Sequence, residues 1–232
     1  MTNKWLKVAL MVTAIATGTS INIDAETVLY VPQDDRPVSL QYTVDTAREA
    51  GMTVLTPPQH LISGKTYQGQ ADQIMAWVEQ NAGRADVMVL STDTLIYGGL
   101  VDSRKHNIPL STLQNRLKRI EGLKARNKNV RIYGFGTVMR SPRASGGGTE
   151  PAYYAEYGPT IFQIAALQDK LDSGSLTQEE TQKLMSLQAS VPVEYLQDWF
   201  SRRQKNMQIN KGLIDEARKG VFEYFALGHD DT

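Results

Sequence analysis

The chain has 232 residues, of which 41% are hydrophobic and 22% are charged, so it can bury a core as one large domain or two small ones. Basic and acidic side chains are equal in number, at 25 each, which argues against nucleic acid and anionic membrane surfaces as partners. This composition also argues against extensive disorder, and the absence of cysteine excludes disulfides.

The first 25 residues have the layout of a secretory signal peptide. Lys4 and Lys7 give a positive start, an apolar run follows at 8–16, and a polar stretch leads to Ala25. The apolar run is shorter than the ~20 residues that span a bilayer. We therefore expect cleavage after Ala25, no stable membrane span afterwards, and a secreted or periplasmic protein. An N-terminal amphipathic helix of a cytosolic protein is the alternative.

From residue 26 onward, strands and helices are predicted to alternate. The segment 27–32 is a β-branched strand, and Ser39 is expected to cap a helix that ends at Ala50. A second strand covers 52–58 and ends in two prolines, and a helix follows near 70–81. The third strand, 85–92, has almost no polar alternation, which predicts burial on both faces.

The next helix is predicted to begin at a capping box made by Ser111 and Gln114. The fourth strand covers 130–139, and a long insertion follows at about 141–192. The insertion contains the glycine-rich stretch SGGG and is otherwise expected to be mostly helical. It is long for a connection, so we expect it to cap or flank a site.

The last predicted elements are two helices and a strand. Thr177 and Glu180 form a second capping box, and a long amphipathic helix follows it. The fifth strand covers 221–228. Strands separated by helices indicate βαβ units and a parallel sheet. We expect a single α/β domain over 26–232 that forms part of a (β/α) barrel-like fold.

Polar residues follow most of the predicted strands. In parallel α/β folds, ligands bind outside the carboxyl ends of the strands, so these residues are expected to meet at one edge. The expected site residues are Asp34, Asp35 and Arg36 after the first strand, Asp93 and Tyr97 after the third, Arg140 after the fourth, and His229, Asp230 and Asp231 after the fifth. The second strand offers only Gln59 and His60.

Structural roles are the alternative for these residues. Asp34 followed by Arg36 and a proline is typical of a turn held by an ion pair, and Asp93 could cap the next segment. The adjacent carboxylates of Asp230 and Asp231 could serve as a general acid and a charge-orienting group, or several aspartates could hold a divalent cation.

Other polar and aromatic residues give weaker signals. His106 lies in the polar stretch SRKHN, which predicts a solvated loop. The tyrosines of YYAEY, among them Tyr154 and Tyr157, could form a stacking platform for sugar rings or pack in the core of a short helix.

Four motifs resemble a bacterial family catalogued as domain-of-unknown-function family 4127. They are VLYVPQDDRPVSL, LSTDTLIYGGLVDSR, VMRSPR followed by YYAEYG, and ALGHDD. The family positions matched include Asp34, Asp35, Arg36, Pro37, Asp93, Gly98, Gly99, Ser103, Arg104, Arg140, Asp230 and Asp231.

The resemblance implies that this chain corresponds to an N-terminal half, because family members are about twice as long and carry the aspartate pair in mid-chain. A half-sheet has an unpaired edge, so self-association through that edge is expected. The resemblance implies no established activity.

Three functions agree with the residues. The favoured one is a carbohydrate-active glycoside hydrolase without a cofactor. An acid pair at a strand end resembles the pair found in hexosaminidases that use the acetamido group of the substrate as the nucleophile. This resemblance implies that Asp230 is the orienting residue and Asp231 the general acid. An oligosaccharide or another small-molecule substrate would then be bound by Asp34, Asp35, Arg36, Asp93, Tyr97, Arg140 and His229, with Tyr154 or Tyr157 as a stacking surface.

The second function is a metal-dependent hydrolase. Its divalent cation would be held by Asp34, Asp93, His229 and Asp230, and Arg36 or Arg140 would bind an anionic oxygen. The third is a non-catalytic sugar-binding protein that uses the same cleft.

Overall fold

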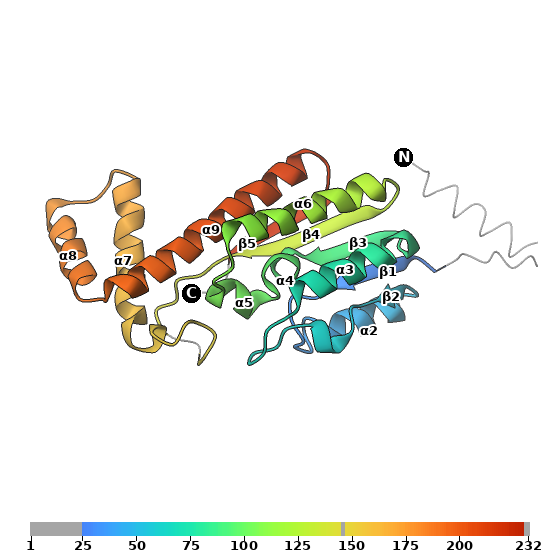
Figure 1. Cartoon of the computed structure of the whole chain (residues 1–232), viewed down its shortest axis with the longest axis horizontal. Coiled ribbons are helices and arrows are strands. Elements are labelled where there is room, and N and C mark those ends of the chain that lie inside the picture. The colour runs from blue at the N-terminus through green and yellow to red at the C-terminus, as the bar shows by residue number, and fades with distance from the viewer. Residues whose placement is uncertain (1–24, 145–146, 230–232) are drawn as a thin grey trace, which may run out of the picture.

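The computed structural model describes residues 25–144 and 147–229 (Figure 1). The predicted signal peptide, apart from Ala25, lies outside the described residues, and so do Asp230 and Asp231. In the part of the chain that is described, no helix is both long enough and apolar enough to cross a membrane.

All five predicted strands form, and they make one parallel sheet. The strands are β1 (Thr27–Val31), β2 (Thr53–Leu55), β3 (Val87–Ser91), β4 (Arg131–Val138) and β5 (Tyr224–His229). Each begins and ends within two residues of its predicted bounds except β2, which stops before its two prolines, and β5, whose pairing begins at Tyr224.

The order of the strands in the sheet is β2-β1-β3-β4-β5. This is the order of open doubly wound sheets of the flavodoxin type, in which ligands bind where the strand order reverses, here between β1 and β3. In a (β/α) barrel, by contrast, successive strands are neighbours. The α/β fold with a parallel sheet is confirmed, and closure into a barrel stays a prediction.

Most helices that connect the strands cover one face of the sheet (Figure 1). The helices are α2 (Gln41–Glu49), α3 (Ala71–Asn81), α4 (Thr92–Tyr97), α5 (Leu100–Lys105), α6 (Leu110–Arg126), α7 (Tyr154–Asp172), α8 (Gln178–Ala189) and α9 (Val193–Arg218). Two 3₁₀ turns, Gln59–Leu61 and Ala82–Arg84, flank α3.

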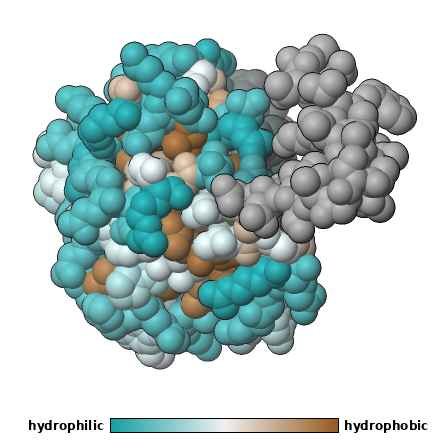
Figure 2. All heavy atoms as spheres, turned by 90° about the vertical axis from the view of Figure 1, so that its right-hand side faces the viewer, coloured by the Kyte–Doolittle hydropathy of each residue, from teal (hydrophilic) through white to brown (hydrophobic). Residues whose placement is uncertain are grey.

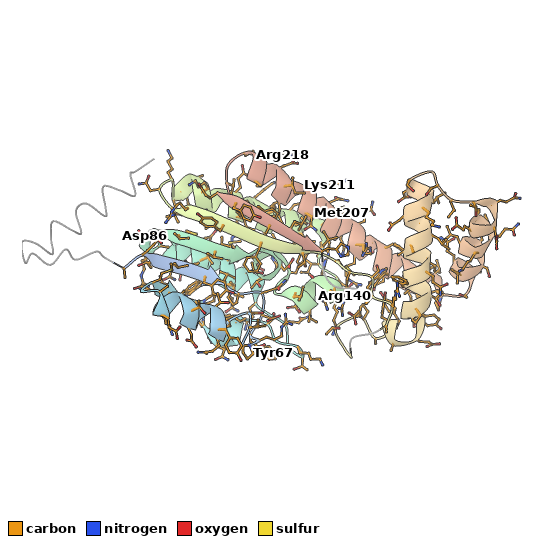
Figure 3. The ribbon with its side chains drawn as sticks, turned by 180° about the vertical axis from the view of Figure 1, so that it is seen from behind. Tyr67, Asp86, Arg140, Met207, Lys211 and Arg218 are labelled. Atoms are coloured by element: carbon orange, nitrogen blue, oxygen red, sulfur yellow. The ribbon has the colours of Figure 1, made fainter. Side chains whose placement is uncertain are left out.

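Helices α3, α6 and α9 pack against the inward side chains of β1, β3 and β4 and form the main core. Leu29, Met88 and Ile132 from the strands meet Ile74 and Leu213 from the helices there. The view from behind shows α2 on the opposite face (Figure 3). On that face, Tyr224 of β5 is 66% exposed.

The insertion forms a second, helical cluster beyond the carboxyl end of the sheet. Helices α7 and α8 and the first part of α9 project at one end of the molecule (Figure 1). Trp199 and Tyr154 are fully buried there, with ring centroids 4.4 Å apart. The prediction of a mostly helical insertion is confirmed.

Two of the three predicted helix caps are wrong. Helix α2 has Leu40 as its N-cap, and Ser39 instead uses its backbone carbonyl to accept a hydrogen bond from the Tyr30 hydroxyl. Helix α6 begins after Pro109, so Ser111 lies inside its first turn. The capping box of Thr177 and Glu180 is confirmed, with both reciprocal hydrogen bonds present.

A candidate site at the carboxyl edge of the sheet

A polar cavity of about 480 Å³ lies at the carboxyl edge of the sheet. Segments that follow β1, β2, β3 and β4 each contribute to its wall. The lining residues are Asp34, Arg36, Ser63, Gly64, Lys65, Leu100, Val101, Arg104, Arg140 and Thr149. The structure therefore brings Asp34, Arg36 and Arg140 together as the sequence predicted. The volume of the cavity suits a small-molecule ligand.

The turn after β1 is held by an ion pair. Asp34 is buried and accepts hydrogen bonds from the Arg36 Nε at 2.8 Å and from the Arg36 backbone N–H at 3.2 Å. Asp35 does not line this cavity; its carboxylate accepts a hydrogen bond from the Tyr67 hydroxyl, and its N–H donates to the Ser63 carbonyl at 2.9 Å. This geometry favours the structural role for the turn and fixes the Asp34 carboxylate at the cavity wall.

Asp93 connects two strands at the same edge but is not part of the cavity lining. Its side chain is 2% exposed, and its Oδ2 accepts hydrogen bonds from Gln33 Nε2 at 3.1 Å and from Thr137 Oγ1 at 2.9 Å. The helix cap is Ser91, whose side chain accepts from the Thr94 N–H, so the alternative that Asp93 caps this helix is wrong. Asp93 holds the loop after β1 against the end of β4.

Two arginines of the cavity lining approach one buried glutamate that does not itself line the cavity. Arg140 donates to Glu150 Oε1 from Nε at 3.1 Å and from Nη2 at 2.6 Å. Arg104 Nη1 lies 3.7 Å from the same oxygen, and Thr149 Oγ1 donates to Oε2 at 3.0 Å. Sequence reasoning placed Arg104 only on a family motif and missed Glu150, because α6 and β4 separate the two residues in the chain and only the fold brings them together.

The loop after β2 contributes more than the sequence predicted. Ser63 and Lys65 line the cavity, while His60 is exposed in the 3₁₀ turn before them. The loop packs closely on the first turn of α5, where the Gly69 N–H donates to Asp102 Oδ2 at 3.0 Å. Burial raises the pKa of Asp102. The expectation that the second strand offers little is therefore wrong.

Tyr97 and His106 are buried beside one another and are not part of the cavity lining. Their ring centroids are 4.9 Å apart. Burial, with a smaller effect of Asp93, raises the pKa of Tyr97 well above its usual value. The prediction of a solvated loop for His106 is wrong, because Asn206 of α9 covers it and accepts a hydrogen bond from its ring at 2.8 Å.

The tyrosines of the insertion do not reach the cavity wall. Tyr154 is fully buried, and its hydroxyl donates to the Pro142 carbonyl at 2.9 Å, so it has no exposed ring face on which a sugar could stack. Tyr157 is half-buried against Tyr195. The alternative of core packing describes Tyr154 correctly.

The fifth strand, β5, ends at the same edge of the sheet as the other strands. His229 is exposed and pairs in register with Val138, two residues before Arg140. Figure 3 shows Arg140 and Tyr67 toward this end of the sheet and Asp86 toward the other. Within residues 25–144 and 147–229, no group of three or more His, Asp or Glu side chains is placed to hold a metal ion.

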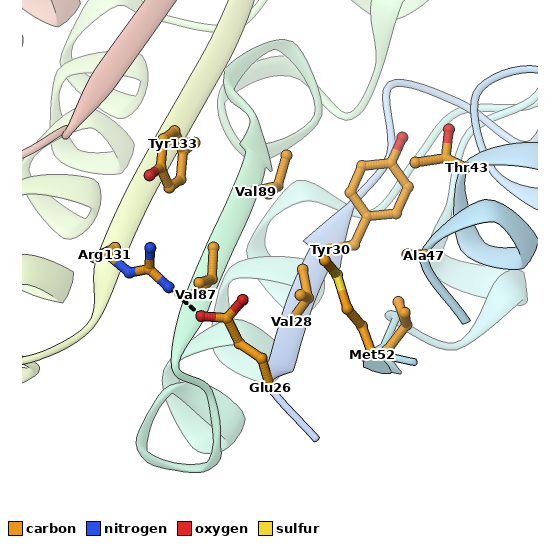
Figure 4. A pocket seen from close by; sticks show the side chains of 11 residues that line it. Glu26, Val28, Tyr30, Thr43, Ala47, Met52, Val87, Val89, Arg131 and Tyr133 are labelled. Carbon is orange, nitrogen blue, oxygen red and sulfur yellow. Dashed lines mark hydrogen bonds and ion pairs between the residues drawn. The ribbon is translucent and has the colours of Figure 1, made fainter. Parts of the chain in front are cut away.

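A second cavity, of about 390 Å³, lies between α2 and the sheet near the amino ends of the strands (Figure 4). Its walls are largely apolar, with Val28, Val87 and Tyr133 among them and an ion pair between Glu26 and Arg131 at its rim. Figure 2, which looks at this end, shows hydrophobic side chains gathered between hydrophilic ones.

Fold and cavity together define an α/β protein with a parallel sheet and a charged cavity at the carboxyl edge. The chain belongs to the family described as protein of unknown function (DUF4127), whose family model matches residues 28–232. The resemblance seen in the motifs is thereby confirmed. Comparisons with curated proteins and with solved structures each found no match.

Proposed function

We propose that this protein is an exported carbohydrate-active hydrolase whose substrate binds in the carboxyl-edge cavity. The observation that carries the proposal is the cavity itself, because segments after four different strands converge on it and supply the charged side chains of Asp34, Arg36, Lys65, Arg104 and Arg140. Convergence of charged side chains at the strand ends is how α/β enzymes build their sites.

In this proposal, Asp231 is the general acid and Asp230 orients and stabilises the reacting group. The register of β5 supports this placement, because His229 pairs with Val138, which precedes Arg140 by two residues in the sequence. Asp34 and Arg140 would bind substrate hydroxyls or charges at the wall, and Asp93 would act as a positioning residue through Gln33 and Thr137.

The test is hydrolysis of a series of glycosides by the chain from Glu26. Asp231→Asn should reduce kcat by about 10²-fold or more, with the largest loss for poor leaving groups, because these depend most on proton donation. Asp215→Asn, an exposed aspartate at the far end of α9, is the matched control and should leave the rate unchanged.

Two other results of this experiment would favour the metal-dependent hydrolase or the sugar-binding protein instead. Activity that a chelator abolishes would overturn the metal-free mechanism in favour of the divalent-cation hydrolase. Sugar binding that Asp231→Asn preserves, with no turnover in either protein, would indicate a binding protein.

Export predicts a mature N-terminus at Glu26, and protein recovered from the cytoplasm with Met1 intact would contradict it.

A further inference from the structure

The outer face of the sheet, opposite α3, α6 and α9, carries aromatic side chains where the inner face carries aliphatic ones. On the inner face, Met88 and Ile132 pack under helices and are 1% exposed or less. On the outer face, Tyr133 and Phe135 of β4 are half-buried, and Tyr224 of β5 is 66% exposed. In the described part of the chain, α2 covers the β1–β2 side of this face, and β4 and β5 lie open to view (Figure 3).

The strand register places these three rings, the aromatic surface, beside one another. Side chains alternate between the two faces along a strand, and a Cβ on Gly134 would meet core side chains of the inner face, so Tyr133 and Phe135 share the outer face. Tyr133 pairs in register with Tyr224, and Phe135 pairs with Ala226. Neighbouring strands lie about 5 Å apart, so the three rings form one continuous patch.

Polar side chains flank the aromatic surface. Arg131 precedes Tyr133 by two residues on β4, so it lies on the same face, and it forms an ion pair with Glu26 (Figure 4). The Arg131 and Glu26 side chains are 48% and 41% exposed, so their donors and acceptors can reach a ligand. The pair has no net charge, which suits an uncharged ligand with hydroxyl groups.

We propose that the aromatic surface binds the pyranose rings of a neutral polysaccharide. A pyranose ring has a flat face of C–H groups, which packs on an aromatic ring, and an edge of hydroxyls, which tyrosine hydroxyls and the Glu26–Arg131 pair can hydrogen-bond. A helix packed on this face would instead meet aliphatic side chains, because parallel sheets buried on both faces are rich in Val, Ile and Leu.

This sugar site is separate from the carboxyl-edge cavity, because none of the three aromatic residues lines that cavity. The proposal goes beyond the hydrolase, since it does not require the aspartate pair after β5. In a polysaccharide-degrading enzyme, such a surface holds the polymer while the cavity acts on it.

Native electrophoresis of the chain from Glu26 in gels that contain hydroxyethyl cellulose, glycol chitin or dextran tests the proposal. At least one of the two β-1,4-linked polymers, whose rings lie in a flat ribbon, should retard the chain. Dextran, whose linkages are flexible, should retard it less. Retardation by neither β-linked polymer, or equal retardation by dextran, would overturn the proposal.

Variants of single rings locate the binding. Tyr133→Ala and Tyr224→Ala should each weaken polymer binding by about fivefold, because each removes a stacking ring, whereas Tyr224→Phe should keep most of the affinity. Tyr42→Ala is the matched control, because Tyr42 is 63% exposed on α2 and lies outside the aromatic surface. Tyr224→Ala should leave Tm nearly unchanged, because the side chain is largely exposed. Full retardation of both alanine variants at Tyr133 and Tyr224 would contradict the proposal.

Two further measurements separate this proposal from its alternatives. Tyr224→Ala should hydrolyse small glycosides at the rate of the unaltered chain, and polymer retardation without any hydrolysis would contradict the proposed function while leaving the sugar surface intact. Size-exclusion chromatography at two protein concentrations tests for a second copy on the same face. Self-association that both Tyr133→Ala and Tyr224→Ala abolish would overturn the proposal, because a second copy would then cover the rings.

Discussion

His106 connects the helix beside the cavity to α9 through a hydrogen-bond pattern that requires a neutral ring. Its Nε2 donates to Asn206 Oδ1 at 2.8 Å, and its Nδ1 accepts from the Ile108 N–H at 3.2 Å. Asn206 in turn donates to the Ser103 carbonyl at 2.8 Å. Burial, outweighing the hydrogen bond to Asn206, lowers the pKa of His106 to about 4.

This pKa predicts a loss of stability in mild acid. Above pH 6.5 the ring is neutral in both states, but between pH 6.5 and about 4 the unfolded chain takes up a proton that the folded protein does not. The free energy of unfolding should therefore fall by about 2 kcal/mol from pH 7 to pH 5 through this residue alone. Urea unfolding at both pH values measures it.

The matched variant for this measurement is His106→Gln, which keeps a donor toward Asn206 but does not titrate. Its stability should depend on pH less steeply than that of the unaltered protein, whatever its stability at pH 7. Identical changes between pH 7 and pH 5 in the two proteins would contradict the assignment.

At the scale of elements, the turn between α4 and α5 fixes the loop that carries Ser63 to the cavity. Helix α4 ends at Gly98, whose φ of 110° favours glycine. A Cβ on Gly99 would lie 1.9 Å from Ser63 Oγ, and one on Gly69 would lie 2.0 Å from the Gly98 carbonyl oxygen. Glycines at these positions let the two loops approach closely, backbone against backbone at Gly69 and Gly98, and backbone against the Ser63 side chain at Gly99.

Gly99→Ala should therefore displace the Ser63 loop and lower the free energy of unfolding by about 1–3 kcal/mol, as overpacking usually does. Gly83→Ala is the control, because nothing lies within 4 Å of a Cβ placed there, and it should change stability by less than about 0.5 kcal/mol. Denaturant unfolding of both variants is the measurement. A Gly99→Ala protein as stable as the control would show that the close approach does not constrain the loop.

At the scale of the whole molecule, the sheet was predictable and the site was predictable in part. Strands such as 85–92 are apolar runs between turn residues, a local pattern, and strand ends in a parallel sheet share an edge by topology. Arg140 and Asp34 could be placed at one site on that basis alone. The roles of Asp93 and Tyr154 could not, because burial decides them.

The residues that were missed depend on contacts between distant segments. His106 sits in a polar stretch, and its burial comes from Asn206, 100 residues later in the chain. Glu150 lies at the end of a glycine-rich loop, and its neighbour Arg104 precedes it by the whole of α6 and β4. Ser111 has the spacing of a cap, but Pro109 starts the helix before it. No local pattern contains these contacts.

Thermal unfolding of the chain from Glu26 is the measurement that tests the central claim, binding of a sugar substrate in the carboxyl-edge cavity, most directly. A ligand that binds only the folded state raises Tm. The account predicts a higher Tm with an N-acetylated amino sugar in the presence of chelator, because the proposed roles of Asp230 and Asp231 are those of enzymes that use the substrate's acetamido group. Runs at two protein concentrations also test self-association through the sheet edge, because association makes Tm concentration-dependent. A Tm that no sugar raises, or one that rises only with a divalent cation and returns with chelator, would contradict the account.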